Sequence, residues 1–288
     1  MSDLPQRVVL LGGSGFLGRA VGRELTRMGI SVVSHSSKTL DLTRGDAADL
    51  LAAQLDQGAA LFFAAALTPD RGQTIASFTS NIAMAATVAR ALEQRPVPCV
   101  FVSSDAVYGF GDEPVTETTA VAPGGFYGLA KYTSEKLLEY VAAAKALPLL
   151  ALRVAAVFGP GDPHASYGPN AFARSLATDR TVRLFGQGEE ERDHLYIDDA
   201  ARLVVQLMRA GATGVFNIAT GSSQSFAQVV DQIRSITPYQ VTVLHAPRRT
   251  PITHRSYDVA ALEHVVPRFA FTPFEDSLRA TLAAFGAL

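Results

Sequence analysis

Apolar residues in the first 159 positions form short continuous runs that alternate with longer amphipathic stretches. The runs at 7–13, 30–36, 59–66, 99–104 and 149–159 lack polar alternation, which is typical of strands buried on both faces of a parallel sheet. Between them, helical spacing covers 16–29, 46–57, 75–94 and 126–146. Alternating strands and helices predict right-handed βαβ units, and hence an α/β fold with a Rossmann-like, doubly wound parallel sheet.

The pattern changes after Gly159, where the segment "GPGDPHASYGPN" is dense in glycine and proline and predicts a loop. Helices are expected near 170–178, 198–210, 225–236 and 274–285, with short strands between them. This texture predicts a smaller mixed α+β domain over 160–288, beside a larger domain over 1–159. Because "VFNIATG" at 215–221 has the character of a core strand, we expect 192–221 to return to the larger domain.

Composition narrows the class of protein. Hydrophobic residues make up 48% and charged residues 18% of the chain, which is ample for a large core and argues against disorder. The net charge of −2 provides no basic field for nucleic acid. The apolar run "AALFFAAAL" is too short to span a bilayer, and the N-terminus is a poor signal peptide, so we expect a cytoplasmic protein. Cys99 is the only cysteine, and neither HxxH nor CxxC spacing occurs, so no metal site is predicted.

A glycine loop joins the first predicted strand to the first predicted helix. In "VVLLGGSGFLG", Gly12, Gly15 and Gly18 have the spacing of a dinucleotide-binding loop. Glycines permit a tight turn and close backbone approach, and the helix N-terminus offers N–H groups to a pyrophosphate. The alternative is a glycine-rich turn without a ligand, but the strand-to-helix context favours a dinucleotide.

The end of the second predicted strand bears on which dinucleotide is preferred. A site for NAD usually has a carboxylate there for the ribose hydroxyls. This chain instead has hydroxyl and basic side chains, namely Ser34, His35, Ser36, Ser37 and Lys38. Together with Arg19 in the first helix, they favour NADP over NAD, although an ordinary solvated loop is the alternative. Asp41 lies beyond the strand and is expected near the adenine.

The segment "FYGLAKYTSEK" contains two Tyr–Lys pairs with the same spacing, Tyr127 with Lys131 and Tyr132 with Lys136. A tyrosine of ordinary pKa is a poor base at neutral pH. A lysine one helical turn away favours the tyrosinate and is expected to lower that pKa. Either pair could therefore serve a proton transfer, and further signals must separate them.

A helical projection of 126–146 offers one such signal. The Tyr127–Lys131 pair borders an apolar stripe that includes Leu129 and Tyr140, where the wall of a site could lie. The second pair shares its face with two carboxylates, Glu135 and Glu139, which predicts solvent or a subunit contact there. The projection thus favours the first pair.

Six segments occur in the order and spacing of the extended short-chain dehydrogenase/reductase family, which the chain resembles over nearly its whole length: "GGSGFLG", "VFVSSDAVYG", "FYGLAK", "LRVAAVFGPG", "RDHLYIDDAA" and "VFNIATGSSQSF". The resemblance implies NAD(P)-dependent chemistry, mostly on sugar nucleotides. In the family, a Ser or Thr precedes the Tyr by about two dozen residues, and Ser104 stands 23 before Tyr127. The resemblance thus implies Tyr127 as acid/base, Lys131 as its electrostatic partner and ribose contact, and Ser104 as the donor that orients the substrate oxygen.

The resemblance also implies which residues hold the ligands, with 1–159 binding the dinucleotide and 160–288 the substrate. The cofactor candidates are Gly12, Gly15, Phe16, Leu17, Gly18, Ser34, His35, Ser36, Lys38, Asp41, Leu42, Ala64, Ala65, Ala66, Asn81, Ser103, Tyr127, Lys131 and Val154. The substrate candidates are Ser104, Asp105, Ala156, Leu184, Phe185, Arg192, Arg249 and Arg255. Leu184 and Phe185 would contact a nucleotide base and Arg192 its pyrophosphate, with an ion pair to Asp193 or Asp198 as the alternative for Arg192. Arg249 or Arg255 would be the second phosphate contact.

The residues after Ser104 discriminate among reactions. Sugar-nucleotide 4,6-dehydratases of the family carry Asp-Glu there, whereas this chain has Asp105 followed by Ala106, which disfavours that reaction. The remaining hypothesis is a 4-epimerase or 4-ketoreductase of a nucleotide sugar, which the resemblance implies to be a homodimer built on helices near 80–94 and 126–146. Ala156 replaces an asparagine that many relatives use to bind the sugar phosphate. A reductase of a non-nucleotide carbonyl substrate and a non-catalytic, dinucleotide-sensing regulator are therefore the alternatives.

Overall fold

The computed structural model describes residues 4–111, 114–164, 167–248 and 250–288. Its centre is a six-stranded sheet with the order β2-β1-β3-β4-β5-β9, in which every neighbouring pair is parallel. The strands are β1 (Arg7–Leu11), β2 (Ser31–His35), β3 (Ala59–Phe63), β4 (Cys99–Val102), β5 (Leu149–Val154) and β9 (Gly214–Ile218). All six core strands predicted from the apolar runs are present, and the predicted α/β fold with its doubly wound sheet is confirmed.

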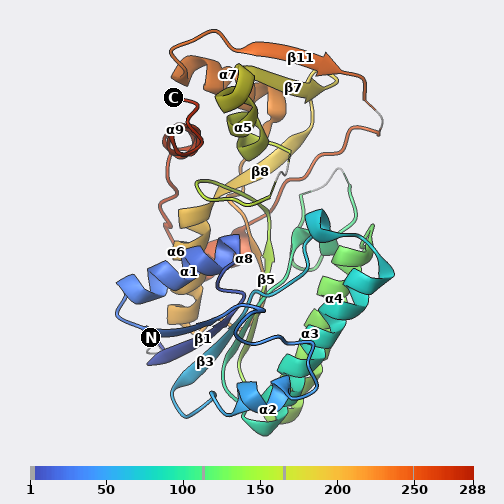
Figure 1. The fold of residues 1–288 in the computed structure, drawn as a ribbon, viewed down its shortest axis with the longest axis vertical. Helices are drawn as coiled ribbons and strands as arrows, with labels where there is room; N and C mark the ends of the chain where they lie inside the picture. The colour runs from blue at the N-terminus through green and yellow to red at the C-terminus, as the bar shows by residue number, and fades with distance from the viewer. Residues whose placement is uncertain (1–3, 112–113, 165–166, 249) are drawn as a thin grey trace.

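Helices cover both faces of this sheet (Figure 1). One face packs against α1 (Phe16–Arg27), α6 (Ile197–Ala210) and α8 (Ala260–Val265), and the other against α2 (Ala47–Ala52), α3 (Ile75–Gln94) and α4 (Phe126–Lys145). Successive residues of a strand enter opposite cores, as Leu10 and Leu11 do on β1. This two-sided burial is the reason that the strands read as continuous apolar runs.

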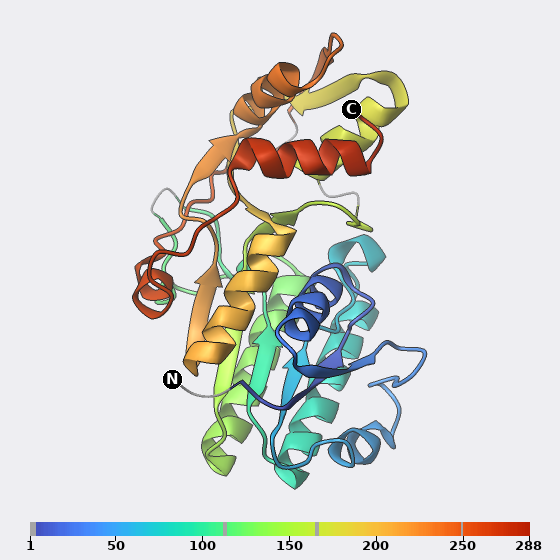
Figure 2. The same cartoon turned by 90° about the vertical axis from the view of Figure 1, so that its left-hand side faces the viewer.

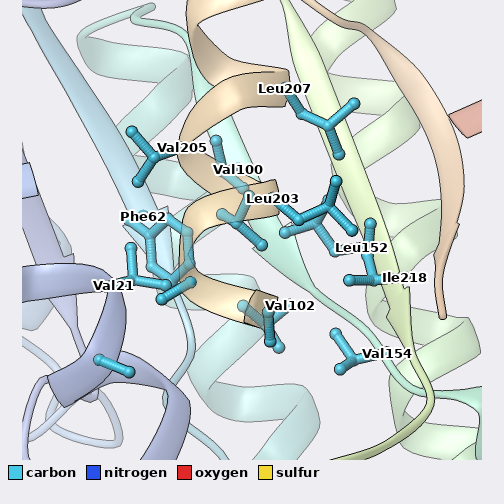
Figure 3. Packing of buried hydrophobic residues seen from close by; sticks show 14 of the residues in the cluster. Val21, Phe62, Val100, Val102, Leu152, Val154, Leu203, Val205, Leu207 and Ile218 are labelled. Atoms are coloured by element: carbon cyan, nitrogen blue, oxygen red, sulfur yellow. The ribbon is translucent and has the colours of Figure 1, made fainter. Parts of the chain in front are cut away.

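Branched aliphatic side chains dominate the core between the sheet and α6. Figure 3 shows Leu203 and Leu207 of α6 close to Leu152 of β5 and Ile218 of β9, and all four side chains are buried. Close packing of this kind makes the sheet a rigid platform for the loops that follow its strands. The functional side chains described below lie at the carboxyl ends of these strands.

A smaller lobe lies beyond those ends, at the top of Figure 1. It contains α5 (Pro169–Asp179), α7 (Phe226–Ile236), α9 (Phe274–Ala284) and the parallel pair β7 (Thr181–Phe185) and β11 (Thr242–Ala246). A second small sheet, in the order β10-β8-β6, connects the lobes through β6 (Ala156–Phe158), β8 (Glu191–Tyr196) and β10 (Ser223–Ser225). Figure 2 shows α9 as the red helix across this lobe.

The chain passes between the lobes more than once. It returns through α6 and β9 to the large sheet. It returns again at α8, where Leu262 and Val266 are buried in the same core as α6. This second return was not predicted, because a helix of six residues shows little periodicity. Among the described helices, none is long and apolar enough to cross a membrane.

Candidate active site

A cleft of ≈ 650 Å³ opens at the carboxyl ends of the central strands. The loops after β1, β3 and β4 and the first turns of α1 and α4 form its walls, and Val154 of β5 contributes at the far end. In open α/β sheets, ligands bind at this edge, near the point where the strand order reverses. Here the order reverses between β1 and β3.

The glycine loop has the geometry that a phosphate cradle requires. Gly12 has φ +88°, and a Cβ there would lie 2.6 Å from the backbone nitrogen of Ala65. A Cβ on Gly18 would lie 2.3 Å from the carbonyl oxygen of Gly12. Gly15 is the N-cap of α1, and no described side chain caps the helix. The first N–H groups of α1 thus face the cleft, and the loop fits a dinucleotide pyrophosphate.

Most of the predicted cofactor residues line this cleft. Besides the three glycines they are Phe16, Leu17, His35, Ser36, Asp41, Leu42, Ala64, Ala65, Ala66, Ser103, Tyr127, Lys131 and Val154. Asp41 accepts hydrogen bonds from the backbone and hydroxyl of Thr43, which hold the pKa of its carboxyl below the usual value. The cleft therefore extends from the glycine loop past the end of β2 and across to α4.

Three predicted cofactor residues lie outside the cleft wall. Ser34 lies against Gly13, whose Cβ would fall 1.8 Å from the serine hydroxyl, and Lys38 is exposed in the following turn. Asn81 is buried, and its side-chain amide binds both the N–H and the carbonyl of Leu67, at 2.8 and 3.1 Å. Asn81 thus shapes the loop that forms the cleft wall. Arg19 lines the cleft, but its guanidinium donates to two carbonyls, of Ser14 and Gly161.

Ser104 and Tyr127 come together through a close approach between two elements. Ser104 follows β4 and is the N-cap of the 3₁₀ turn η2 (Asp105–Val107), whose Ala106 N–H it accepts at 3.1 Å. A Cβ on Gly128 of α4 would lie 2.0 Å from the carbonyl oxygen of Ala106. Only glycine permits this contact. It brings Tyr127, at the start of α4, to the same part of the cleft as Ser104.

Lys131 lies one helical turn further on and is 5% exposed. Its Nζ donates to the carbonyl of Val102 at 2.6 Å and lies 5.7 Å from the centre of the Tyr127 ring. Burial lowers the pKa of Lys131 to about 8, although the charge of Glu135 opposes this change. Lys131 is therefore a cation at neutral pH whose charge is lost under mildly alkaline conditions.

The pKa of Tyr127 is raised, not lowered as the sequence led us to expect. Burial is the main cause, the charge of Asp105 adds to it, and the Ser104 hydroxyl acts in the opposite direction. The expectation was wrong because it counted only the lysine and not desolvation of the phenol. Tyr127 is thus held as the phenol, which can act as a hydrogen-bond donor.

The second Tyr–Lys pair lies away from the cleft. Lys136 donates to Glu139 at 2.7 Å, lies 5.5 Å from the centre of the Tyr132 ring and remains partly exposed. The helical projection nevertheless misassigned the faces of α4. Glu135 is fully buried, whereas Tyr140 of the apolar stripe is 77% exposed. The projection failed because α4 turns a polar face toward the end of β4.

Two predicted phosphate contacts, Arg192 and Arg255, lie close to the ring of Phe110. Arg192 donates to the carbonyl of Thr253 at 2.6 Å, and its guanidinium lies 5.6 Å from the Phe110 ring centre. Arg255 is 4% exposed, donates to the carbonyl of Gly109 at 2.7 Å and lies 4.5 Å from the same ring. Arg249 lies outside the described residues.

The alternative partners of Arg192 are engaged elsewhere. Asp193 accepts the backbone N–H groups of Thr220 and Gly221, and Asp198 pairs with Arg23 at 3.3 Å. The structure thus shows no ion pair from Arg192 to either aspartate. Its guanidinium donates to the backbone carbonyls of Glu191 and Thr253, and its role toward phosphate stays a prediction.

The other substrate candidates differ in exposure. Leu184 is buried in the core of the smaller lobe, whereas its neighbour Phe185 is 41% exposed. Ala156 is exposed on β6. Asp105 lines the cleft and accepts the hydroxyl of Tyr257 at 2.9 Å. Of this group, only Asp105 lies in the wall that also contains Ser104.

Several cleft residues carried no signal in the sequence. The loop 162–164 crosses from the smaller lobe, and His164 pairs with Asp70 at 3.0 Å. Leu67, Thr68 and Arg71 also line the cleft. Arg71 ends the short 3₁₀ helix η1 (Pro69–Arg71), and the other residues come from irregular loops whose course depends on tertiary packing. Within the described ranges, no group of three or more His, Cys, Asp or Glu could hold a metal ion.

Comparison with known proteins places the chain in a described family. A sequence model described as the NAD dependent epimerase/dehydratase family matches residues 8–219. The chain belongs to this family. The resemblance to extended short-chain dehydrogenases/reductases is thereby confirmed, and with it a family whose chemistry depends on NAD.

Relatives of this family member catalyse different reactions. A UDP-glucose 4-epimerase of Lactobacillus helveticus is 25% identical over 281 residues, which cover 84% of this chain and 85% of the relative. Two solved structures share the fold. RMD of Pseudomonas aeruginosa, complexed with NADPH, has TM-score 0.86 at 21% identity and covers 98% of this chain and 99% of its own. TunA, an NAD-dependent NDP-hexosamine 5,6-dehydratase, has TM-score 0.85 at 23% identity and covers 98% of each chain.

Proposed function

We propose that the protein is an NAD(P)-dependent 4-epimerase or 4-ketoreductase that acts on a carbinol or ketone carbon of a nucleotide sugar. One observation carries the proposal. Ser104, Tyr127 and Lys131 line the same cleft as the glycine loop. A substrate oxygen beside Tyr127 would therefore lie next to a dinucleotide held at the N-terminus of α1.

Each of the three side chains has a distinct role in this proposal. The Tyr127 hydroxyl exchanges a proton with the substrate oxygen, and the Ser104 hydroxyl donates a hydrogen bond to the same oxygen. Lys131 supplies a fixed positive charge behind the tyrosine and holds the nicotinamide ribose. The nicotinamide ring, when bound, supplies or accepts the hydride. Because Tyr127 is held as the phenol, the arrangement suits delivery of a proton to a ketone oxygen.

NADP is the proposed preference among the two dinucleotides. His35 and Ser36 line the cleft beyond the end of β2, at the place where a carboxylate would select for NAD. Hydroxyl and imidazole groups can donate hydrogen bonds to a 2′-phosphate, whereas a carboxylate at this place would repel it. Relatives bind either form, as the NADPH complex of RMD and the NAD-dependent TunA illustrate.

The smaller lobe, which the chain builds within 160–288, is the proposed substrate-binding region. Phe185 presents an exposed ring, and Arg192 stacks on Phe110 near Asp105. The curated relative acts on UDP-glucose, as its name states. A reductase of a non-nucleotide carbonyl is the second candidate. Arg255 already donates to a backbone carbonyl, and Ala156 has no side-chain amide that could bind a sugar phosphate.

Elimination chemistry is disfavoured in this proposal. The position after Asp105 is Ala106, whose side chain cannot remove a proton. A cytoplasmic homodimer is proposed as well, built on α3 and α4. Tyr140 is 77% exposed and Leu129 40% exposed on the outer face of α4, a surface that a second copy would cover.

The first test is to denature the purified protein without added cofactor and identify released dinucleotide by mass spectrometry. Bound NAD⁺ or NADP⁺ supports an epimerase, which regenerates its own cofactor in each cycle. An empty protein that binds NADPH and reduces 4-keto sugar nucleotides supports the ketoreductase. If no UDP-, GDP- or dTDP-sugar is turned over or protects the protein against thermal unfolding, the nucleotide-sugar proposal is overturned in favour of a non-nucleotide carbonyl.

A further inference from the structure

A buried polar network lies behind the candidate active site, centred on Glu135 of α4. Its carboxylate is fully buried and forms an ion pair with Arg153 of β5 at 2.7 Å. It also accepts the hydroxyl of Ser103. Arg153 donates in turn to the hydroxyl of Tyr108 at 2.9 Å, which donates to the side-chain oxygen of Asn217 on β9 at 2.8 Å. The network therefore joins α4 to the ends of three strands.

The contacts of α4 with β4 form two adjacent attachment points. Lys131 donates to the carbonyl of Val102, and Glu135, one helical turn later, accepts from Ser103. Val102 and Ser103 are consecutive, and the next residue is Ser104. Side chains four apart on a helix share a face. The two attachments thus fix the register between α4, which carries Tyr127, and the end of β4, which carries Ser104.

Charge gives Glu135 a second connection to the site. Tyr127 and Glu135 lie near Lys131 on its own helix. Of the charged groups packed against these two residues, Asp105 of η2 acts on Tyr127 and Arg153 of β5 pairs with Glu135. Among them, Glu135 is the group whose charge acts on the Lys131 ammonium. The carboxylate therefore opposes the desolvation that favours neutral lysine.

A buried ion pair adds little to the free energy of unfolding, so the presence of one here calls for another explanation. Two buried charges cost desolvation free energy, and apolar residues of similar volume are often as stable or more so. Stability alone thus does not account for Glu135 and Arg153 here. The location of the pair suggests a function, because Glu135 contacts Ser103, the neighbour of Ser104, and its charge acts on Lys131.

We propose that Glu135 is a positioning residue that holds Ser104 in register with Tyr127 through Ser103 and keeps Lys131 in its cationic form. This inference rests on the proposed function for its catalytic meaning, but not for its physical test. The residue itself touches neither substrate nor cofactor in this proposal.

The test follows the lysine directly. The chain has only four lysines, Lys38, Lys131, Lys136 and Lys145. NMR of protein labelled with [ε-¹³C]lysine resolves their titrations, and Lys131→Met assigns the signal. In Glu135→Gln, which keeps the shape and the acceptor for Ser103, the pKa of Lys131 is expected to fall by about one unit or more. An unchanged Lys131 titration in folded Glu135→Gln would overturn the electrostatic half of the proposal.

Two further variants separate position from general damage. Glu139→Gln, on the same helix but paired with Lys136, is the matched control. It should alter the titration of Lys136 and leave that of Lys131 unchanged. If Glu135→Gln does not fold, Glu135→Gln with Arg153→Met removes the unpaired cation as well. The pKa of Lys131 should again lie below that of the wild type, and an equal value would count against the proposal.

Kinetics test the attachment at Ser103. Ser103→Ala removes this contact while Glu135 keeps its ion pair with Arg153. The variant should lose about tenfold to a hundredfold in kcat with little change in KM, because the geometry at Ser104 loosens. An unchanged kcat would refute the positioning half. A wild-type protein without turnover on any sugar nucleotide would refute the proposed function, whereas the lysine titration would still decide the role of Glu135.

Discussion

The two Tyr–Lys pairs of α4 have the same spacing on the same helix, yet the fold treats them in opposite ways. Tyr127 and Lys131 line the cleft, and Lys131 is buried. Tyr132 and Lys136 lie outside it, where Lys136 pairs with Glu139. A displacement of five residues rotates a side chain by about 140° around a helix. Two motifs of the same spacing can therefore face different environments, and the environment decides which of them is placed for proton transfer.

Electrostatics follow from this rotation. Burial lowers the pKa of Lys131 to about 8, whereas the hydrogen bond that Lys136 donates to Glu139 raises the pKa of Lys136. The Lys131 ammonium at the cleft therefore loses its proton at a lower pH than the Lys136 ammonium at the surface. The difference teaches that a sequence motif supplies the titratable side chains, and that desolvation in the folded protein shifts their pKa values.

Removing each tyrosine hydroxyl should separate the pairs most strongly. Tyr127→Phe is expected to lower turnover about 10²–10⁴-fold, because it removes the proposed proton donor. Tyr132→Phe should leave turnover within about twofold, since its ring packs outside the cleft. Steady-state rates on the sugar nucleotide that the wild type turns over provide the comparison. Equal losses in both variants would contradict the assignment of the first pair.

Stability should show the cost of burying Lys131. The unfolded lysine has its usual pKa of 10.5, and the folded value is about 8. The unfolded chain thus binds more protons between these values, and wild-type stability should rise with pH across this window. Lys131→Met should be more stable at pH 7 by up to about 3 kcal/mol, and the gain should vanish near the upper limit.

Lys136→Met is the matched control for this measurement. Its partly exposed ion pair with Glu139 should contribute about 1 kcal/mol or less. Urea unfolding at neutral and alkaline pH measures both variants. A Lys131→Met protein that is no more stable than Lys136→Met at pH 7 would show that the buried ammonium is compensated.

The alkaline limb of the rate profile should belong to Lys131 alone. If its positive charge is required, turnover should fall by about tenfold per pH unit above the Lys131 pKa of about 8. Turnover falls, and does not rise, with pH because the lysine loses its proton and its positive charge as pH rises. Lys136→Met should keep the same limb. A limb that moves with Lys136, or rates that stay constant into the alkaline range, would contradict this role for Lys131.

The outer face of α4 should show the smallest effect on catalysis. Tyr140→Glu should weaken self-association, on the order of tenfold in the dimer Kd, while turnover per site stays within about twofold. Leu244→Glu on β11 is the control, because that leucine is 45% exposed but belongs to the smaller lobe. Sedimentation velocity measures both variants. Equal association in the two variants would argue against α4 as the contact surface.

Short continuous apolar runs made the central sheet predictable. The runs at 59–66 and 149–159 contain β3 and β5 because strands buried on both faces need apolar side chains throughout. The glycine loop was predictable for a similar reason, since Gly12 and Gly18 leave no room for a Cβ. The family resemblance also singled out Ser104, Tyr127 and Lys131, which the structure brings to one cleft.

The faces of α4 were not predictable in the same way. The helical projection placed Glu135 on a face expected to meet solvent or a subunit, and Tyr140 in an apolar stripe where the wall of a site could lie. Glu135 is instead fully buried, and Tyr140 is 77% exposed. Glu135 is buried because Arg153 and Ser103, distant in sequence, satisfy its charge and its lone pairs. No periodicity within one helix contains that information.

The sequence by itself determined the α/β fold, the glycine loop and the residue types available for proton transfer. These are local properties, set by backbone freedom and by the burial that each segment requires. Only the tertiary structure decided which Tyr–Lys pair faces the cleft, that burial raises the pKa of Tyr127, and that Glu135 attaches α4 beside Ser104. Charge and reactivity depend on neighbours brought together by folding, because solvation and Coulomb terms act through space and not along the chain.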